Sequence, residues 1–132
     1  MASRLTELAI DCADPQRLAR FWCSVLAYAV QDEGDGIVTI GSPAVPESRS
    51  DLASVPVTLT FAQVPEPKTA KNRLHLDLSP TDREQDAEVR RLLDLGARHV
   101  DVGQGDQTWV VLADPEGNEF CVLAGGPLPP SG

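Results

Sequence analysis

The stretch LTELAIDCADPQRLARFWCSVL, residues 5–26, joins a strand to a helix and decides the fold. Residues 5–10 alternate loosely between apolar and polar side chains, which predicts a β-strand. Asp14 and Pro15 then predict a helix start, because Asp is a preferred N-cap and proline at the first helical position loses no hydrogen bond. One apolar stripe predicts a helix over about 15–27: Leu18, Phe21, Trp22, Val25 and Leu26.

The rest of the first half predicts further strands. Asp35 and Gly36 are a hairpin signal, and GIVTI, which begins at Gly36, predicts the strand that follows. Residues 42–55 are rich in proline and serine and show no period, so they predict a loop that is longer than most connections. Residues 57–64, VTLTFAQV, predict another strand, and residues 65–71 predict a linker.

The strand RLHLDL, residues 73–78, opens the second half. Its strict alternation predicts a half-buried strand. Because successive side chains of a strand point to opposite faces, its three leucines are expected to pack beneath the helices. His75 and Asp77 then share the opposite face of the strand.

Helix and strand signals follow in the same order as in the first half. Asp82 and Gln85 resemble a capping box, which predicts a helix start at Asp82, and Gly96 predicts the helix end. The turn sequence Asp-Pro-Glu-Gly connects the last two predicted strands, and residues 125–132 predict a flexible tail. Three strands are predicted after the helix: 97–102, 108–113 and 119–124.

Both halves therefore read strand, helix and three strands. A shift of 68 residues (75 minus 7) places Glu7 on His75 and Asp14 on Asp82. The matched order predicts an α+β fold of two tandem βαβββ modules within one domain, residues 1–132. Module one covers about 4–64 and module two about 72–124. A half of about 60 residues is marginal alone, so the two are expected to share a core.

The composition excludes several classes of protein. The 132 residues carry 20 Asp and Glu against 11 Lys and Arg, a net charge of -9. Nucleic acids and anionic membranes both require clustered basic residues, so neither is expected as a partner. The three cysteines suit neither a disulfide framework nor a zinc knuckle, which predicts reduced thiols in a cytoplasmic protein.

The doubled βαβββ order resembles the vicinal oxygen chelate superfamily, which includes glyoxalase I, bleomycin-resistance proteins and extradiol dioxygenases. The resemblance implies that the modules form a curved mixed sheet, a half-barrel cleft with the helices outside, which binds a small molecule. It also implies a homodimer. Four segments carry the resemblance and cover nearly the whole chain: DCADPQRLARFWCSVLAY, VPEPKTAKNRLHLDL, EVRRLLDLGARHVDVGQG and WVVLADPEGNEFCVL.

Metal-dependent members of that superfamily place ligands on the first and last strands of each unit. The positions that match on the first strands are Glu7 and His75. On the last strand of the second half the match is Cys121, where a carboxylate usually stands. In the first half the match is Thr60, or Thr58 if the register differs by two residues. The resemblance thus implies a divalent metal held by these residues.

The same residues have other interpretations. His75, Glu7 and Asp77 are candidate catalytic residues, because an imidazole beside carboxylates can polarise a ligand or transfer a proton. They can equally form a structural network in which His75 hydrogen-bonds Glu7. Cys121 can ligate zinc as a thiolate, but a small buried hydrophobe is the commoner fate of a free cysteine and is favoured here.

Aromatic residues are expected mainly in the core. Trp22, Phe61 and Phe120 are assigned to it, while His99 is expected to be solvated. Trp109 is either a core residue, the favoured interpretation, or a flat wall against a planar ligand. As a wall it would line the substrate cleft together with Thr58.

Four functions are consistent with the sequence. The first is a metal-dependent lyase, isomerase or dioxygenase that chelates adjacent substrate oxygens. The second is a metal-free protein that sequesters a ligand, as in antibiotic resistance, with loop 42–55 as a lid. The third is a metal-free enzyme that uses an acid–base residue, and the fourth is a structural or regulatory dimer.

Overall fold

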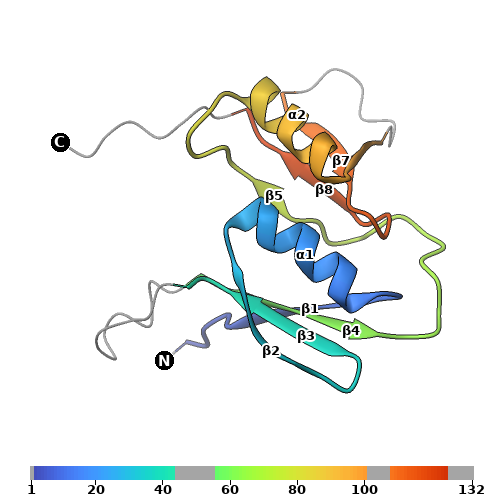
Figure 1. Cartoon of the computed structure of the whole chain (residues 1–132). Coiled ribbons are helices and arrows are strands. Elements are labelled where there is room, and N and C mark those ends of the chain that lie inside the picture. The colour runs from blue at the N-terminus through green and yellow to red at the C-terminus, as the bar shows by residue number, and fades with distance from the viewer. Residues whose placement is uncertain (1, 44–55, 101–107, 125–132) are drawn as a thin grey trace. The chain divides into compact units, whose positions relative to one another are not determined.

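The computed structural model describes residues 2–43, 56–100 and 108–124 of the chain. It divides into two compact units, Met1–Pro67 and Lys68–Gly132, and the boundary falls within the segment predicted as a linker. Each unit is described by itself (Figure 1). Most of the predicted loop 42–55 and all of the predicted tail lie outside the described residues.

The first unit is a four-stranded mixed sheet with one helix. Its sheet has the order β1-β4-β3-β2, in which β1 and β4 are parallel and the other pairs are antiparallel. Helix α1 packs against β3 and β4 (Figure 1). The elements are β1 (Glu7–Cys12), α1 (Pro15–Leu26), β2 (Ala29–Gly34), β3 (Ile37–Gly41) and β4 (Thr58–Gln63).

Helix α1 begins as its sequence predicts. The Asp14 side chain accepts a hydrogen bond from the backbone N–H of Arg17 at 3.2 Å, which satisfies a donor that the first helical turn leaves without a partner. The apolar stripe is buried except for the half-buried Leu26, and Trp22 is only 1% exposed. The helix ends at Ala27, whose backbone is left-handed with φ 56°.

The second unit repeats the same plan. Its sheet has the order β5-β8-β7-β6, with β5 and β8 parallel and the other pairs antiparallel. The equivalent strand orders confirm the predicted α+β fold of two βαβββ modules. The elements are β5 (Asp77–Leu78), α2 (Gln85–Leu95), β6 (Arg98–His99), β7 (Val110–Ala113) and β8 (Glu119–Val122).

All four strands of the second unit are shorter than predicted, and β5 and β6 contain only two residues each. The strand expected over 73–78 has ladder pairing only at Asp77–Leu78, and Leu74 is 82% exposed, so the prediction that it packs beneath a helix is wrong. The segment before β5 is held instead by hydrogen bonds between Asn72 and Glu119. Strand β6 contains two residues of the predicted 97–102, of which 101 and 102 lie outside the described residues.

The predicted capping box of the second helix is also wrong. Helix α2 begins at Gln85, and its N-cap residue, Glu84, makes no side-chain capping bond. Asp82 pairs with the guanidinium of Arg83 at 2.7 Å, so its carboxylate binds a side chain and not a helix N–H. Gly96 ends the helix as predicted, with φ 122°, a conformation that favours glycine.

The turn between β7 and β8 forms around a buried carboxylate. Asp114 is fully buried and accepts hydrogen bonds from the backbone N–H groups of Glu116 and Asn118 and from the Asn118 amide. Gly117 has φ 86°, which a side chain would strain. The turn confirms the Asp-Pro-Glu-Gly signal and fixes where β8 begins.

Candidate functional site

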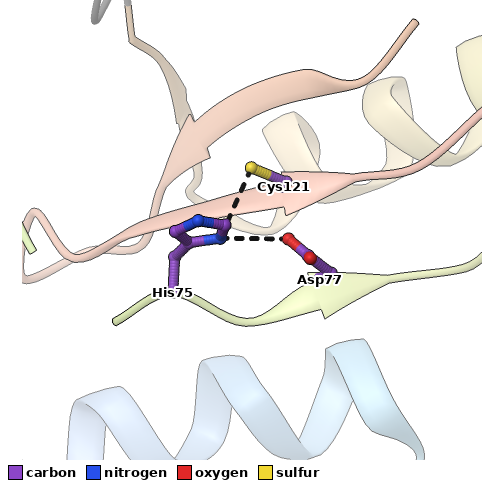
Figure 2. Close-up of side chains that lie close together, drawn as sticks. All are labelled: His75, Asp77 and Cys121. Carbon is purple, nitrogen blue, oxygen red and sulfur yellow. Dashed lines mark hydrogen bonds and ion pairs between the residues drawn. The ribbon is translucent and has the colours of Figure 1, made fainter. Parts of the chain in front are cut away.

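Three side chains of different chemistry meet in the second unit: His75, Asp77 and Cys121 (Figure 2). The Nδ1 atom of His75 lies 3.0 Å from Oδ1 of Asp77 and 3.8 Å from Sγ of Cys121. One potential ligand atom from each residue lies within 4.8 Å of the others. We call these three residues the His75 cluster.

The parallel pairing of β5 and β8 places this cluster. Asp77 and Cys121 are direct register partners, and the backbone N–H of Cys121 donates to Leu76 at 2.9 Å. His75 stands two residues before Asp77, just ahead of β5, and its ring lies beside the Asp77 carboxylate. The cluster therefore combines a short sequence spacing with one long-range strand pair.

A second network holds the segment that leads to His75. Lys68 Nζ lies 2.7 Å from a carboxylate oxygen of Glu119, and the backbone N–H of Asn72 donates to the same carboxylate at 3.2 Å. The Asn72 amide also donates to the Glu119 carbonyl at 3.4 Å. Glu119 stands two residues before Cys121 on β8. The strand that carries Cys121 therefore also holds the segment that leads to His75.

Sequence patterns did not find this network. Glu119 and Asn72 are 47 positions apart, and neither belongs to a motif whose spacing predicts a contact. The sequence offers one hint of this network, which is that three polar residues, Lys68, Lys71 and Asn72, stand shortly before the predicted strand 73–78.

Exposure and charge differ within the His75 cluster. The side chains of His75 and Asp77 are 43% and 48% exposed, whereas Cys121 is only 6% exposed. Burial raises the pKa of the Cys121 thiol, and the negative charge of Asp77 raises it further. The free thiol is therefore neutral at physiological pH, which disfavours a role as a nucleophile.

The geometry of the cluster suits convergence on a cation more than proton relay. A catalytic Cys–His–Asp relay uses the two different ring nitrogens of histidine, one toward each partner. Here Asp77 and Cys121 both approach the same Nδ1 atom. A tetrahedral zinc site places a nitrogen ligand about 3.4 Å from an oxygen ligand and about 3.6 Å from a sulfur ligand. The observed separations of 3.0 and 3.8 Å are near these two edges, and all three donor atoms lie within 4.8 Å of one another, so these residues could hold a metal ion.

The equivalent position in the first unit holds Glu7 and Thr60. The Thr60 hydroxyl donates to the Glu7 carboxylate and lies 2.9 Å from the Thr39 hydroxyl. Ala9 pairs with Thr60 as Asp77 pairs with Cys121, and 77 minus 9 is again 68. The register thus makes Thr60 the counterpart of Cys121.

Thr58 has other contacts. It is the register partner of Glu7, and its hydroxyl donates to the carbonyl of Thr6 at 3.3 Å. Glu7 and Thr60 belong to the first unit, and His75 and Cys121 to the second. The joint ligand set of four residues and the cleft role of Thr58 stay predictions.

The remaining predicted residues divide between core and surface. Trp22, Phe61 and Phe120 are buried as predicted, and His99 is exposed as predicted. The favoured core interpretation of Trp109 is wrong, because this side chain is 41% exposed at the start of the turn into β7. Its alternative role as a wall of the substrate cleft stays a prediction.

A hollow of about 470 Å³ lies elsewhere, in the first unit. It is lined by the start of α1 and the β2–β3 hairpin, including Asp14, Glu33 and Asp35. None of the predicted site residues lines it, and it is open and acidic. The convergence of donor atoms therefore makes the His75 cluster the stronger candidate site.

Comparison with known proteins identifies the family to which the chain belongs. The sequence model of the glyoxalase-like domain matches residues 7–123. The chain therefore belongs to the glyoxalase-like family, which confirms the predicted superfamily. No curated protein matches the sequence.

Solved structures show the same fold at low sequence identity. A glyoxalase/bleomycin resistance protein/dioxygenase family enzyme from Burkholderia phytofirmans is 15% identical, with a TM-score of 0.66 over 91% of this chain and 97% of that chain. A mutant of the fosfomycin resistance protein FosX from Listeria monocytogenes is 13% identical, with a TM-score of 0.66 over 95% and 92%. That FosX structure contains Mn(II) and dihydroxypropylphosphonic acid.

A third similar structure is the oxidase ChaP-H2, which is 15% identical, with a TM-score of 0.58 over 96% of this chain and 97% of that chain. Neighbours of one fold thus differ in activity, so the fold does not define the reaction. Within the part of the chain that the structure describes, neither helix has the length and apolar character needed to cross a membrane.

Proposed function

We propose that this glyoxalase-like protein binds a small molecule with adjacent oxygens and acts on it as a lyase, isomerase or dioxygenase, with a divalent metal at the His75 cluster. The observation that carries the proposal is the meeting of imidazole, carboxylate and thiol within 4.8 Å. Three protein ligands are the usual number in a catalytic zinc site, because a fourth position stays available for water or substrate.

The residues of the cluster have distinct roles in this proposal. His75 and Cys121 hold the metal, and Asp77 beside His75 either completes the ligand set or accepts a proton from the substrate. The exposure of His75 and Asp77 leaves the cluster open to a ligand from solvent. A bound metal ion supplies Lewis-acid polarisation of the substrate oxygens.

Glu7 is proposed as a further ligand or base, as the resemblance implies. Its carboxylate accepts the Thr60 hydroxyl, which holds it in one orientation. If Glu7→Gln weakens metal binding as much as His75→Ala does, Glu7 belongs to the ligand set. An unchanged affinity restricts the ligand set to the second unit.

The test uses nitrocatechol, a probe with two adjacent oxygens whose visible spectrum shifts when it coordinates a metal. The metal-loaded protein is expected to shift the spectrum at one probe per chain, and a chelator is expected to reverse the shift. His75→Ala should lose the shift, and His99→Ala, which alters an exposed histidine of the same unit, should keep it. If both variants keep the spectral shift, the proposal is contradicted.

A metal-free, ligand-sequestering protein is the second candidate function. It is favoured by the network of the first unit, in which the Glu7 carboxylate accepts the Thr60 hydroxyl and the Thr60 hydroxyl also lies beside that of Thr39, so that a neutral donor already contacts the carboxylate. The acidic chain would then prefer a cationic ligand. Thermal protection by a ligand that persists in the presence of a chelator would support this candidate.

We also propose a cytoplasmic homodimer. No disulfide joins Cys12, Cys23 and Cys121, as expected in a reducing compartment. Strand β2 is exposed along its length at the edge of its sheet, and an edge strand can pair with a second chain. Light scattering is expected to give about twice the chain mass of 14.1 kDa, and a monomer at all concentrations would refute the dimer.

A further inference from the structure

We infer that the His75 cluster binds its metal through the Cys121 thiolate, which makes it a zinc-class site that selects against Mn(II). The inference rests on the proposed function, since both require a metal at this cluster. It goes further by naming the class of metal and the atom that selects it. The fold by itself does not determine which metal is bound, because the FosX neighbour with the same fold contains Mn(II).

The first step is the direction of the sulfur atom. Cys121 lies on β8 with its side chain 6% exposed, and its Sγ lies 3.8 Å from the Nδ1 atom of His75 (Figure 2). Sγ is thus on the side of the strand where His75 and Asp77 meet, and it belongs to the group of converging donor atoms. A cysteine that served only as a core hydrophobe would not need this alignment with two polar side chains.

The second step is the chemistry of the donor set. Soft thiolate ligands select zinc and other thiophilic metals, whereas carboxylate, carbonyl and water ligands suit manganese and magnesium. One nitrogen, one oxygen and one sulfur form a set of ligands that is intermediate between hard and soft. Divalent affinities also rise from manganese through cobalt toward zinc for a given nitrogen, oxygen and sulfur site. Both effects favour zinc.

The third step is the local completeness of the site. All three donors belong to the second unit, and His75 stands two residues before Asp77 of β5. The contacts of Glu119 with Lys68 and Asn72 hold the segment before β5 beside β8. Asp77 therefore supplies the oxygen ligand from within the unit. His75 would hold the metal through an unprotonated Nδ1, so any proton shared between Nδ1 and Asp77 would be released to solvent on binding.

The test uses Co(II) as a spectroscopic substitute for zinc on the full chain. A cobalt ion bound to a thiolate produces a sulfur-to-metal charge-transfer band, which nitrogen and oxygen ligands do not. We expect this band at one cobalt per chain and its loss when zinc is added. Competition is expected to give a preference for zinc over Mn(II) on the order of 100-fold or more.

Matched variants separate the thiolate from the other ligands. Cys121→Ser is nearly isosteric, and it is expected to lose the charge-transfer band and most of the preference for zinc. Cys23→Ser alters a cysteine of the first unit and should keep both. Asp77→Asn is expected to keep the band but weaken zinc binding about 10-fold or more, the scale of losses seen around metal sites.

Two results would overturn the inference, and they are distinguishable. Cobalt that binds at one ion per chain without the charge-transfer band would remove Cys121 from the ligand set and overturn the inference, while a metal held by His75 and Asp77 would still allow the proposed metal-dependent function. No binding of cobalt, zinc or Mn(II) to the native protein would remove both. The measurements on the native protein keep the test valid even if Cys121→Ser does not fold.

Discussion

At the scale of single residues, Cys121 shows that a buried cysteine and a candidate metal ligand can be the same residue. The sequence favoured a small buried hydrophobe, and the residue is buried. Its sulfur atom nevertheless lies against His75, so burial does not exclude a ligand role. The distinction depends on the direction of one side-chain atom, which the residue type does not encode.

Glu119 is the residue through which pH should act on stability. Its burial acts to raise the pKa, but the hydrogen bonds from Lys68 and from the backbone N–H of Asn72 outweigh burial and lower the pKa below its ordinary 4.5. A depressed carboxyl pKa contributes stability above the unfolded value and loses it as the pH falls. The free energy of unfolding should therefore decrease as the pH falls below about 4.5.

Glu119→Gln tests this prediction. The variant should be less stable at neutral pH by about 1–2 kcal/mol, because it loses the charge in two hydrogen bonds. Its stability should also change less on acidification. Urea denaturation over a series of pH values measures both effects, with Glu66→Gln, an exposed linker carboxylate, as the control. Parallel pH curves for Glu119→Gln and the native protein would contradict the prediction.

At the scale of elements, the two helices show when a capping motif is reliable. Asp14 directly precedes a proline and an apolar stripe, and it caps α1. Asp82 has Gln85 at the spacing of a capping box, but the neighbouring Arg83 donates hydrogen bonds to both carboxylate oxygens of Asp82. Gln85 reaches instead to the carbonyls of Thr108 and Val122. A neighbouring guanidinium thus competes with a helix N–H for the same oxygen atoms.

The difference predicts unequal effects of removing the two carboxylates. Asp14→Ala should lower the free energy of unfolding by about 1 kcal/mol, the usual cost of losing an N-cap. Asp82→Ala should change it little, because the exposed pair with Arg83 is screened by solvent. Chemical denaturation of both variants measures the contrast. Equal losses would indicate that Asp82 caps α2 in solution.

At the scale of the whole molecule, the repeat is the main feature. Both units have the same strand order. The offset of 68 residues relates their first strands, whereas the counterparts on their last strands, Thr60 and Cys121, are 61 residues apart (121 minus 60). The cluster positions, however, have diverged to glutamate and threonine in one unit and to histidine and cysteine in the other. The repeat therefore conserves the backbone plan and not the chemistry.

The charge of the whole chain predicts which macromolecules it does not bind. A net charge of -9 opposes association with phosphate backbones, which requires clustered basic residues to release counterions. Fluorescence anisotropy with a labelled duplex DNA at physiological salt is expected to show no binding at micromolar protein. Salt-sensitive binding in that range would indicate a basic patch that the overall charge conceals.

The sequence by itself determined the order of elements, the repeat, the apolar stripe of α1 and the turn at Asp114, because these depend on local propensity and on periodicity. It also selected His75, Asp77 and Cys121 as candidates. The tertiary structure decided which of them meet and with what geometry. The exposure of Leu74 and Trp109, the pairing of Asp82 with Arg83 and the contacts of Glu119 also followed from tertiary contacts. Contacts between residues nearly fifty positions apart depend on strand register and side-chain direction, and neither leaves a periodic trace in the sequence.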